Sequence, residues 1–144
     1  MDAEVKDAGA AAESQTPSTA SGQAAAYALL DRFAAAWNAH DVDGLMACMA
    51  PDCAFETAAG KDVHGTRHVG AEAVRRAYAA VFETYTDARW QRPSHFVAGD
   101  RAVSEWTFTG TLKDGTRVEV NGCDIFTLKD GKIALKNSYR KQRS

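Results

Sequence analysis

The sequence predicts an α+β fold in which helices come first and an antiparallel sheet follows. Apolar residues recur at helical spacing up to about residue 85, and beyond residue 87 they alternate with polar residues. The alternating runs are separated by the turn pairs Gly99-Asp100, Asp114-Gly115 and Asp130-Gly131. Such pairs between alternating runs are typical of β-hairpins. Helices followed by a meander of strands define the α+β class.

The composition favours a single soluble domain. A chain of 144 residues is long enough to bury a core, and a net charge of -2 gives no reason to expect nucleic acid as a partner. No apolar run approaches the roughly 20 residues of a membrane span. Cys48, Cys53 and Cys123 are odd in number and lack metal-ligand spacing. They indicate reduced thiols in a cytoplasmic protein, with no zinc site.

Residues 1–20 differ from the rest in composition. They are rich in Ala, Ser, Thr and acidic residues, and they lack the basic start and apolar centre of a signal peptide. We expect a disordered leader there, because the segment cannot bury enough apolar surface to fold. Residues 21–144 are predicted to form one domain.

The first predicted helix starts near residue 22 and carries one apolar face, made by Tyr27, Leu30, Phe33 and Trp37. Phe33 and Trp37 either pack in the core or line a cavity at its wider end.

A short second helix is expected after Asp41, which is a good cap, and Pro51 is predicted to end it. Residues 52–57 then read as a strand in which Phe55 faces the interior and Glu56 does not.

Residues 60–70 are predicted to form a loop, and a third helix to run from residue 71 to about residue 85. The loop holds His64 and His68, four apart, but a loop does not give a histidine pair the geometry of a helical metal site. His64 is interpreted as a polar contact at a cavity mouth or as an ordinary exposed residue. Tyr78 belongs to the apolar face of the helix.

Four strands are expected over residues 88–98, 101–112, 117–128 and 132–140. Long strands joined by tight turns form a strongly twisted sheet, and three helices on one face would leave a conical apolar pocket. Trp106 and Phe108 share a face with Gly110 and are expected to point inward, as core or as pocket wall.

Asp124 is the residue that does not fit the core. It alternates with Phe126 and Leu128, so its carboxyl group is predicted to face the interior. Burial of an unpaired charge is costly, and desolvation is expected to raise the pKa of this group. Asp124 is therefore either a general acid or proton shuttle, or a structural carboxyl with hydrogen-bond partners.

The neighbour of Asp124 on the last strand depends on the hairpin register. A two-residue loop pairs Leu128 with Ile133 and places Asn137 opposite Asp124, with Tyr139 beside it. We favour this register, because it keeps the apolar residues of both strands on one face.

A three-residue loop with a bulge would instead bring Lys136 and Ser138 to that face. A slip of one residue turns every side chain of a strand to the other side. Lys136 would then hold the carboxylate of Asp124 in its ionised form.

The order of these elements resembles the nuclear transport factor 2-like superfamily, and most closely its SnoaL-like branch. The resemblance covers residues from about 22 to 141. It rests on Trp37-Asn38-Ala39-His40-Asp41, Gly65 to Val74, Glu105 to Gly110 and Asp124 to Ile133. It implies a curved sheet wrapped around helices, a deep apolar pocket, and homodimers that form through the outer sheet face.

Position matching to the ketosteroid isomerases of that superfamily is only partial. Asp124 matches the acid that donates a hydrogen bond to an oxyanion, and it is similar to a catalytic acid of polyketide cyclases. The isomerase base falls at Thr57 and the isomerase tyrosine at Phe33. Ketosteroid isomerase activity is therefore not expected.

Three functions remain open. The first is cofactor-independent acid–base chemistry by Asp124 on a small apolar molecule, of isomerase, cyclase, dehydratase or hydrolase type. The second is a non-catalytic binding or dimerisation module, and the third a structural protein with a filled interior. No cofactor is expected, because the chain lacks a phosphate-binding glycine loop and a metal set. The predicted pocket residues are Phe33, Trp37, Phe55, His64, Tyr78, Trp106, Phe108, Phe126, Asn137 and Tyr139.

Overall fold

The computed structural model of the protein describes residues 20–144. The predicted leader therefore lies outside the described residues, except for Ala20, where the first helix begins. No helix within the described part of the chain is long and apolar enough to cross a membrane.

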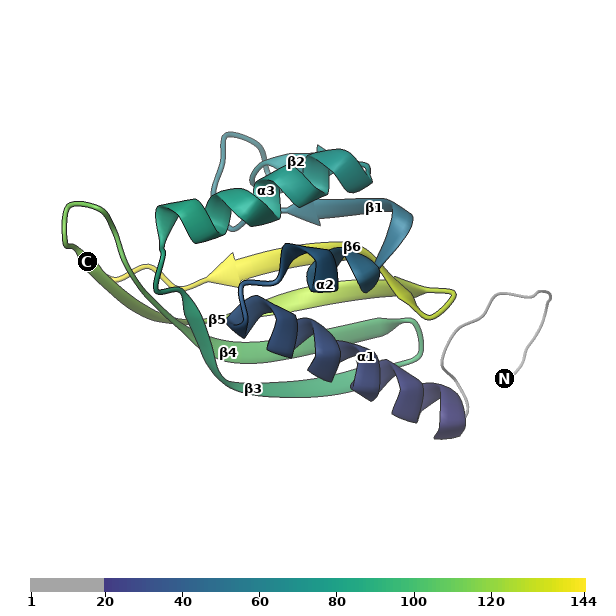
Figure 1. Ribbon diagram of the computed structural model, residues 1–144. Coiled ribbons are helices and arrows are strands. Elements are labelled where there is room, and N and C mark those ends of the chain that lie inside the picture. The colour runs from purple at the N-terminus through teal and green to yellow at the C-terminus, as the bar shows by residue number, and fades with distance from the viewer. Residues whose placement is uncertain (1–19) are drawn as a thin grey trace.

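Three helices cover one face of a sheet, as Figure 1 shows. They are α1 (Ala20–Asn38), α2 (Val42–Ala47) and α3 (Ala71–Thr84). The predicted cap is confirmed, since the Asp41 carboxylate accepts a hydrogen bond from the Gly44 amide over 3.0 Å. Helix α2 ends before Pro51, however, and Pro51 lies inside the next strand. The pairing register of that strand shifts between Met49 and Ala54, where a residue without an amide hydrogen is tolerated.

Six strands form one sheet in the order β2-β1-β6-β5-β4-β3. Their bounds are β1 Met49–Glu56, β2 Arg67–Val69, β3 Arg89–Ala98, β4 Arg101–Thr111, β5 Arg117–Lys129 and β6 Lys132–Arg140. The predicted meander corresponds to β3 through β6. Strand β2 lies in the segment predicted as a loop, and β1 pairs with β6 in parallel. The α+β class is confirmed, and the sheet is antiparallel except for that one pair.

The core lies between the helices and the sheet. Helix α1 packs against β3 and helix α3 against β1, so the two long helices cover different halves of the sheet (Figure 1). The main apolar cluster includes Leu30, Phe33, Phe126 and Ile133. A second cluster, built around Phe108, lies beside the end of α3 and the β4–β5 turn. The interior pocket described below lies where these two clusters meet.

The β5–β6 hairpin decides which side chains face the interior. Asp130 and Gly131 form the two-residue turn with φ values of 52° and 77°, and Leu128 pairs with Ile133 as predicted. The register then shifts, because Thr127 pairs with Leu135 and leaves Ala134 as an extra residue in β6.

The shift overturns the favoured placement of the last strand. Ser138, not Asn137, lies opposite Asp124, and Lys136 lies opposite Phe126. The alternative set of Lys136 and Ser138 therefore faces inward. It does so through a bulge within β6 and not through a longer turn.

Candidate functional site: a buried Asp124–Lys136 pair beside an aromatic pocket

Asp124 is a buried carboxylate that lies in register between Ser104 of β4 and Ser138 of β6. The Trp106 indole Nε1–H donates to Oδ2 over 3.0 Å, and the Ser138 hydroxyl donates to Oδ1 over 2.6 Å. An ionised carboxylate only accepts hydrogen bonds, so it suits this ring of donors.

Lys136 is the cation that pairs with this carboxylate. Its Nζ lies 3.2 Å from Asp124 Oδ1 and donates to Ser138 Oγ over 2.7 Å. The rings of Phe55 and Trp37 lie 4.5 Å and 5.1 Å from Nζ, within the range of cation–π attraction. Burial lowers the pKa of Lys136 from its ordinary value of 10.5, and the charge of Asp124 opposes that effect. Lys136 therefore releases its proton more readily than an exposed lysine.

Gly122 makes room for the indole that reaches Asp124. It lies opposite Trp106 in the β4–β5 pairing. A Cβ atom at Gly122 would lie 2.6 Å from ring atoms of Trp106, closer than side chains tolerate. A residue without a side chain thus lets the indole lie across β5 toward Asp124.

A pocket of about 390 Å³ opens beside this pair, between α3 and the sheet. Lys136, Ser138 and Arg140 line it from alternate positions of β6, and Ala77 and Ala80 line it from α3. Its aromatic wall consists of Trp37, Phe55, Tyr85, Trp90, Trp106 and Phe108. A concave, largely apolar site with a few polar groups is typical of small-molecule pockets.

Asp124 faces a different and much smaller space. That void, of about 20 Å³, is lined by Asp124, Phe33, Phe126 and Lys136 among others, and it is too small for a ligand. Lys136 and Trp106 border both spaces. The carboxylate therefore stands one residue behind the pocket wall, and Lys136 is the member of the pair that a ligand would meet.

Seven of the ten predicted pocket residues lie in the interior and fall into three groups. Four of them, Trp37, Phe55, Trp106 and Phe108, line the pocket. Phe33 and Phe126 pack around the small void. Tyr78 is fully buried against the rings of Phe33, Trp37 and Phe55, and its hydroxyl donates to Met49 Sδ over 3.5 Å.

The remaining predicted residues lie elsewhere. Asn137 and Tyr139 are on the outer face of β6, where the Asn137 amide donates to the Tyr139 hydroxyl over 3.1 Å. Both are turned away from the pocket because of the bulge at Ala134. His64 lies in the loop after β1 and lines neither the pocket nor the small void.

Several pocket residues were not predicted from the sequence, among them Tyr85, Trp90, His68 and Arg140. His68 lies on β2, stacks on Phe55 with ring centroids 5.9 Å apart, and lines the pocket. The segment that contains it has no alternation long enough to predict a strand. Arg140 ends β6, and its guanidinium lies 4.8 Å from the Phe108 ring centroid. No local sequence pattern marks it as a pocket residue.

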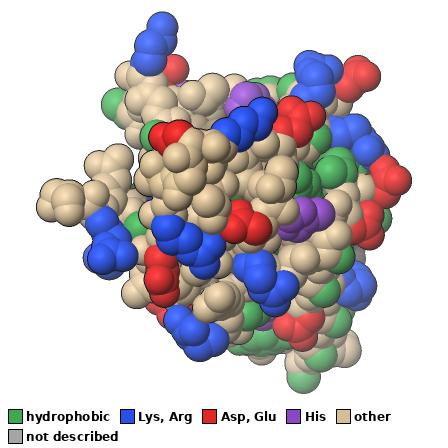
Figure 2. All heavy atoms as spheres, turned by 60° about the vertical axis from the view of Figure 1, so that its left-hand side comes forward, with side chains coloured by type: hydrophobic (Ala, Val, Ile, Leu, Met, Phe, Trp, Pro, Cys, Tyr) green, Lys and Arg blue, Asp and Glu red, His purple; other side chains and the backbone are tan. Residues whose placement is uncertain are grey.

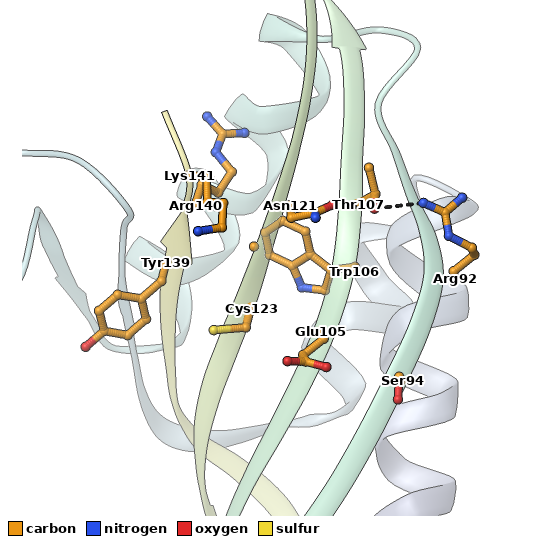
Figure 3. A pocket seen from close by; sticks show the side chains of 11 residues that line it. Arg92, Ser94, Glu105, Trp106, Thr107, Asn121, Cys123, Tyr139, Arg140 and Lys141 are labelled. Carbon is orange, nitrogen blue, oxygen red and sulfur yellow. Dashed lines mark hydrogen bonds between the residues drawn. The ribbon is translucent and has the colours of Figure 1, made fainter. Parts of the chain in front are cut away.

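A larger hollow, of about 670 Å³, lies on the outer face of the sheet (Figure 3). The Arg92 guanidinium donates to Thr107 Oγ1 over 2.9 Å, and that hydroxyl donates to the Asn121 side chain over 2.7 Å. The hollow is an open surface, and these polar groups satisfy one another. The smaller interior pocket is the better candidate, because it combines aromatic walls with a buried charge pair.

Within residues 20–144, no group of His, Cys, Asp or Glu side chains is arranged to hold a metal ion. The chemistry that the site can perform is that of Lys136, Asp124 and Ser138. These groups can donate hydrogen bonds, place a positive charge near a ligand oxygen, and move a proton.

Three helices on one face of a curved sheet, with a pocket between the layers, define the NTF2-like class of α+β folds. The chain belongs to the SnoaL-like domain family, whose sequence model matches residues 30–136. Among curated proteins, none matches the chain.

Solved structures share the fold. A protein from Xanthomonas campestris pv. campestris named for polyketide cyclase activity is 20% identical, with a TM-score of 0.73 over 83% of this chain and 92% of that chain. An NTF2-like protein of unknown function from Mesorhizobium loti is 28% identical, with a TM-score of 0.69 over 83% and 93%. TerC, crystallised with polyporic acid, is 22% identical, with a TM-score of 0.70 over 81% and 92%.

Proposed function

We propose that the interior pocket binds a small apolar ring compound and carries out cofactor-independent acid–base chemistry on it. The observation that carries this proposal is the buried Lys136–Asp124 pair, whose lysine lines an aromatic pocket. A buried ion pair is weak evidence of a stabilising role, because desolvation offsets its attraction. Because the ion pair lies beside a cavity, a role in binding or chemistry explains it better than a role in stability does.

In the proposed chemistry, Lys136 presents an N–H group to a carbonyl oxygen of the ligand. Negative charge that develops on that oxygen during isomerisation, cyclisation or dehydration is stabilised by the ammonium group. The lowered pKa of Lys136 lets it donate a proton to that oxygen and take it back. Asp124 acts behind Lys136, since it holds the ammonium in place and balances its charge.

The names of two structural neighbours agree with this class of ligand. One is named for polyketide cyclase activity, and the other was crystallised with polyporic acid. A pocket of about 390 Å³ is large enough for an aromatic ring system.

The test is turnover by the wild-type protein compared with Asp124→Asn. Aromatic carbonyl compounds that raise the melting temperature of the wild type are incubated with both proteins, and products are followed by mass spectrometry. We expect the wild type to convert at least one such compound and Asp124→Asn only to bind it, because a neutral amide no longer supplies the negative charge that holds and balances the Lys136 ammonium. Asp43→Asn is the matched control, since Asp43 is an exposed carboxylate outside the pocket.

If every stabilising compound is bound but none is converted by either protein, the non-catalytic binding module is the correct description. That alternative is favoured by the enclosed position of Asp124, which does not line the pocket. If no compound binds at all, the proposal of a ligand pocket fails as well.

We also propose that two copies pair through the outer sheet face. Phe96 and Tyr139 are 54% and 51% exposed there, and Val103 and Ile125 lie between them on neighbouring strands. Exposed apolar groups of this size on a sheet face mark an interaction surface. We expect Phe96→Asp to shift the sedimentation of the protein from dimer to monomer, whereas Val63→Asp, at an exposed loop position, leaves it unchanged.

A further inference from the structure

The charged side chains that line the interior pocket are all basic. Among the described residues around it, Lys136 and Arg140 line the pocket and no Asp or Glu does. Figure 2 shows that basic and acidic side chains are interspersed over the surface on this side of the molecule. The excess of positive charge is thus a property of the pocket lining and not of the surrounding surface.

The Arg140 guanidinium is available to a ligand. It lies over the Phe108 ring at 4.8 Å, which fixes it at the pocket wall. In the part of the chain that the structure describes, no carboxylate forms an ion pair with it. Its charge is close enough to Lys136 to contribute to the lowered pKa of that residue. An anion beside Arg140 would relieve this repulsion.

The carboxylate of Asp124 does not line the pocket, and Lys136 balances its negative charge. Its two oxygens already accept hydrogen bonds from Trp106 and Ser138, and the Lys136 ammonium lies between it and the cavity. An anion that enters the pocket therefore meets the positive charge of Lys136 first, whereas a cation would be repelled by Lys136 and Arg140.

The arrangement on β6 suggests the shape of the ligand. Lys136, Ser138 and Arg140 occupy alternate positions on one face, so the Cα atoms of the first and last lie about 13 Å apart along the strand. We propose that the pocket selects a planar aromatic acid, with its acidic group at Arg140 and a second oxygen toward Lys136 and Ser138. This inference rests on the proposed function, because it names the ligand class of the same pocket.

The test uses 4-nitrocinnamate and its uncharged amide as a matched probe pair. All three tryptophans of the chain line the pocket, so quenching of intrinsic fluorescence reports binding there. We expect the anion to bind more tightly than the amide by about fivefold or more. Arg140→Gln should weaken binding of the anion by about threefold to fivefold, which is the range expected for a partly exposed ion pair. Binding of the amide should not change.

Two further variants locate the effect. Arg101→Gln removes an exposed cation that does not line the pocket, so the affinity for either probe should not change. Ala80→Leu narrows the pocket from the α3 side and should weaken the binding of both probes equally. Added salt should weaken the binding of the anion and not that of the amide, because it screens the charge of Arg140.

The outcomes separate this inference from the proposed function. Binding of both probes with equal affinity overturns the selection of anions but leaves the pocket intact. If the anion binds more tightly than the amide and Arg140→Gln does not change this preference, the assignment of Arg140 is overturned. Failure of both probes to bind overturns the pocket itself, and with it the proposed function.

Discussion

Two pairs of an Asp with a basic residue, one inside the molecule and one on its surface, show how much the surroundings decide. Lys136 Nζ lies 3.2 Å from Asp124 Oδ1, and Arg75 Nη1 lies 2.8 Å from Asp43 Oδ1. The side chains of the first pair are 8% and 7% exposed, and those of the second are 47% and 87% exposed. The shorter contact is thus the one that water reaches.

The difference lies in what replaces a lost partner. At the surface, water solvates the remaining charge, so the pair contributes little. In the interior, the remaining charge would be left among aromatic rings, where no water can solvate it. The interior pair is therefore hard to break even though it adds little net stability, which is the behaviour expected of a retained functional group.

The largest effect should come from Lys136→Met. The substitution keeps an unbranched side chain but leaves the Asp124 carboxylate buried without its cation. We expect a loss of about 3–5 kcal/mol in the free energy of unfolding, measured by urea denaturation.

The double variant Lys136→Met/Asp124→Asn provides the control. It removes both charges together, so it should recover most of the stability that the single variant loses. A double variant as unstable as Lys136→Met would show that the loss comes from packing around residue 136 and not from an unpaired charge.

The second prediction concerns Tyr78, which lies beside the interior pair. Burial raises the pKa of Tyr78 well above its ordinary value of 10.0, and the negative charge of Asp124 adds to the shift. The folded state then keeps a proton that the unfolded state releases. The stability due to this group is complete below pH 10.0 and falls as the pH rises above that value.

We expect the free energy of unfolding to fall by up to about 1.4 kcal/mol per pH unit above the ordinary tyrosine pKa. In Tyr78→Phe this part of the decline should be absent. The pKa of each of the three cysteines is also raised by burial, but the cysteines are shared by both proteins and cancel in the difference. Urea unfolding at about pH 9 and about pH 11 gives the measurement, and parallel declines in the two proteins would contradict it.

The sequence predicted much of this interior, and its failures have local causes. Helices α1 and α3, strands β3 to β6 and the inward carboxylate of Asp124 follow from periodicity. The turn at Asp130 and Gly131 was also correct.

The partner of Asp124 could not be fixed in this way. Ala134 bulges out of the β5–β6 pairing after a turn of the predicted length, and this single extra residue brings in Lys136. An alanine in a strand carries no signal of a bulge. Alternation therefore identified both candidate faces of β6 but could not choose between them.

Longer-range pairing was the other limit. Strand β1 joins β6 in parallel across some 80 residues of sequence, and β2 has only the three residues Arg67–Val69. Neither leaves a local pattern. His68 could be assigned to the pocket only once β2 was paired with β1.

The smallest effect should come from Arg75→Gln at the surface pair. Gln and Arg have similar helix propensities, so the substitution on α3 tests the ion pair with Asp43 and little else. We expect a loss below about 1 kcal/mol that shrinks further in high salt. A double-mutant cycle with Asp43→Asn, measured beside the cycle for Lys136 and Asp124, compares the two coupling free energies directly. A coupling at the surface as large as that in the interior would mean that distance, and not exposure to water, sets the strength of these pairs.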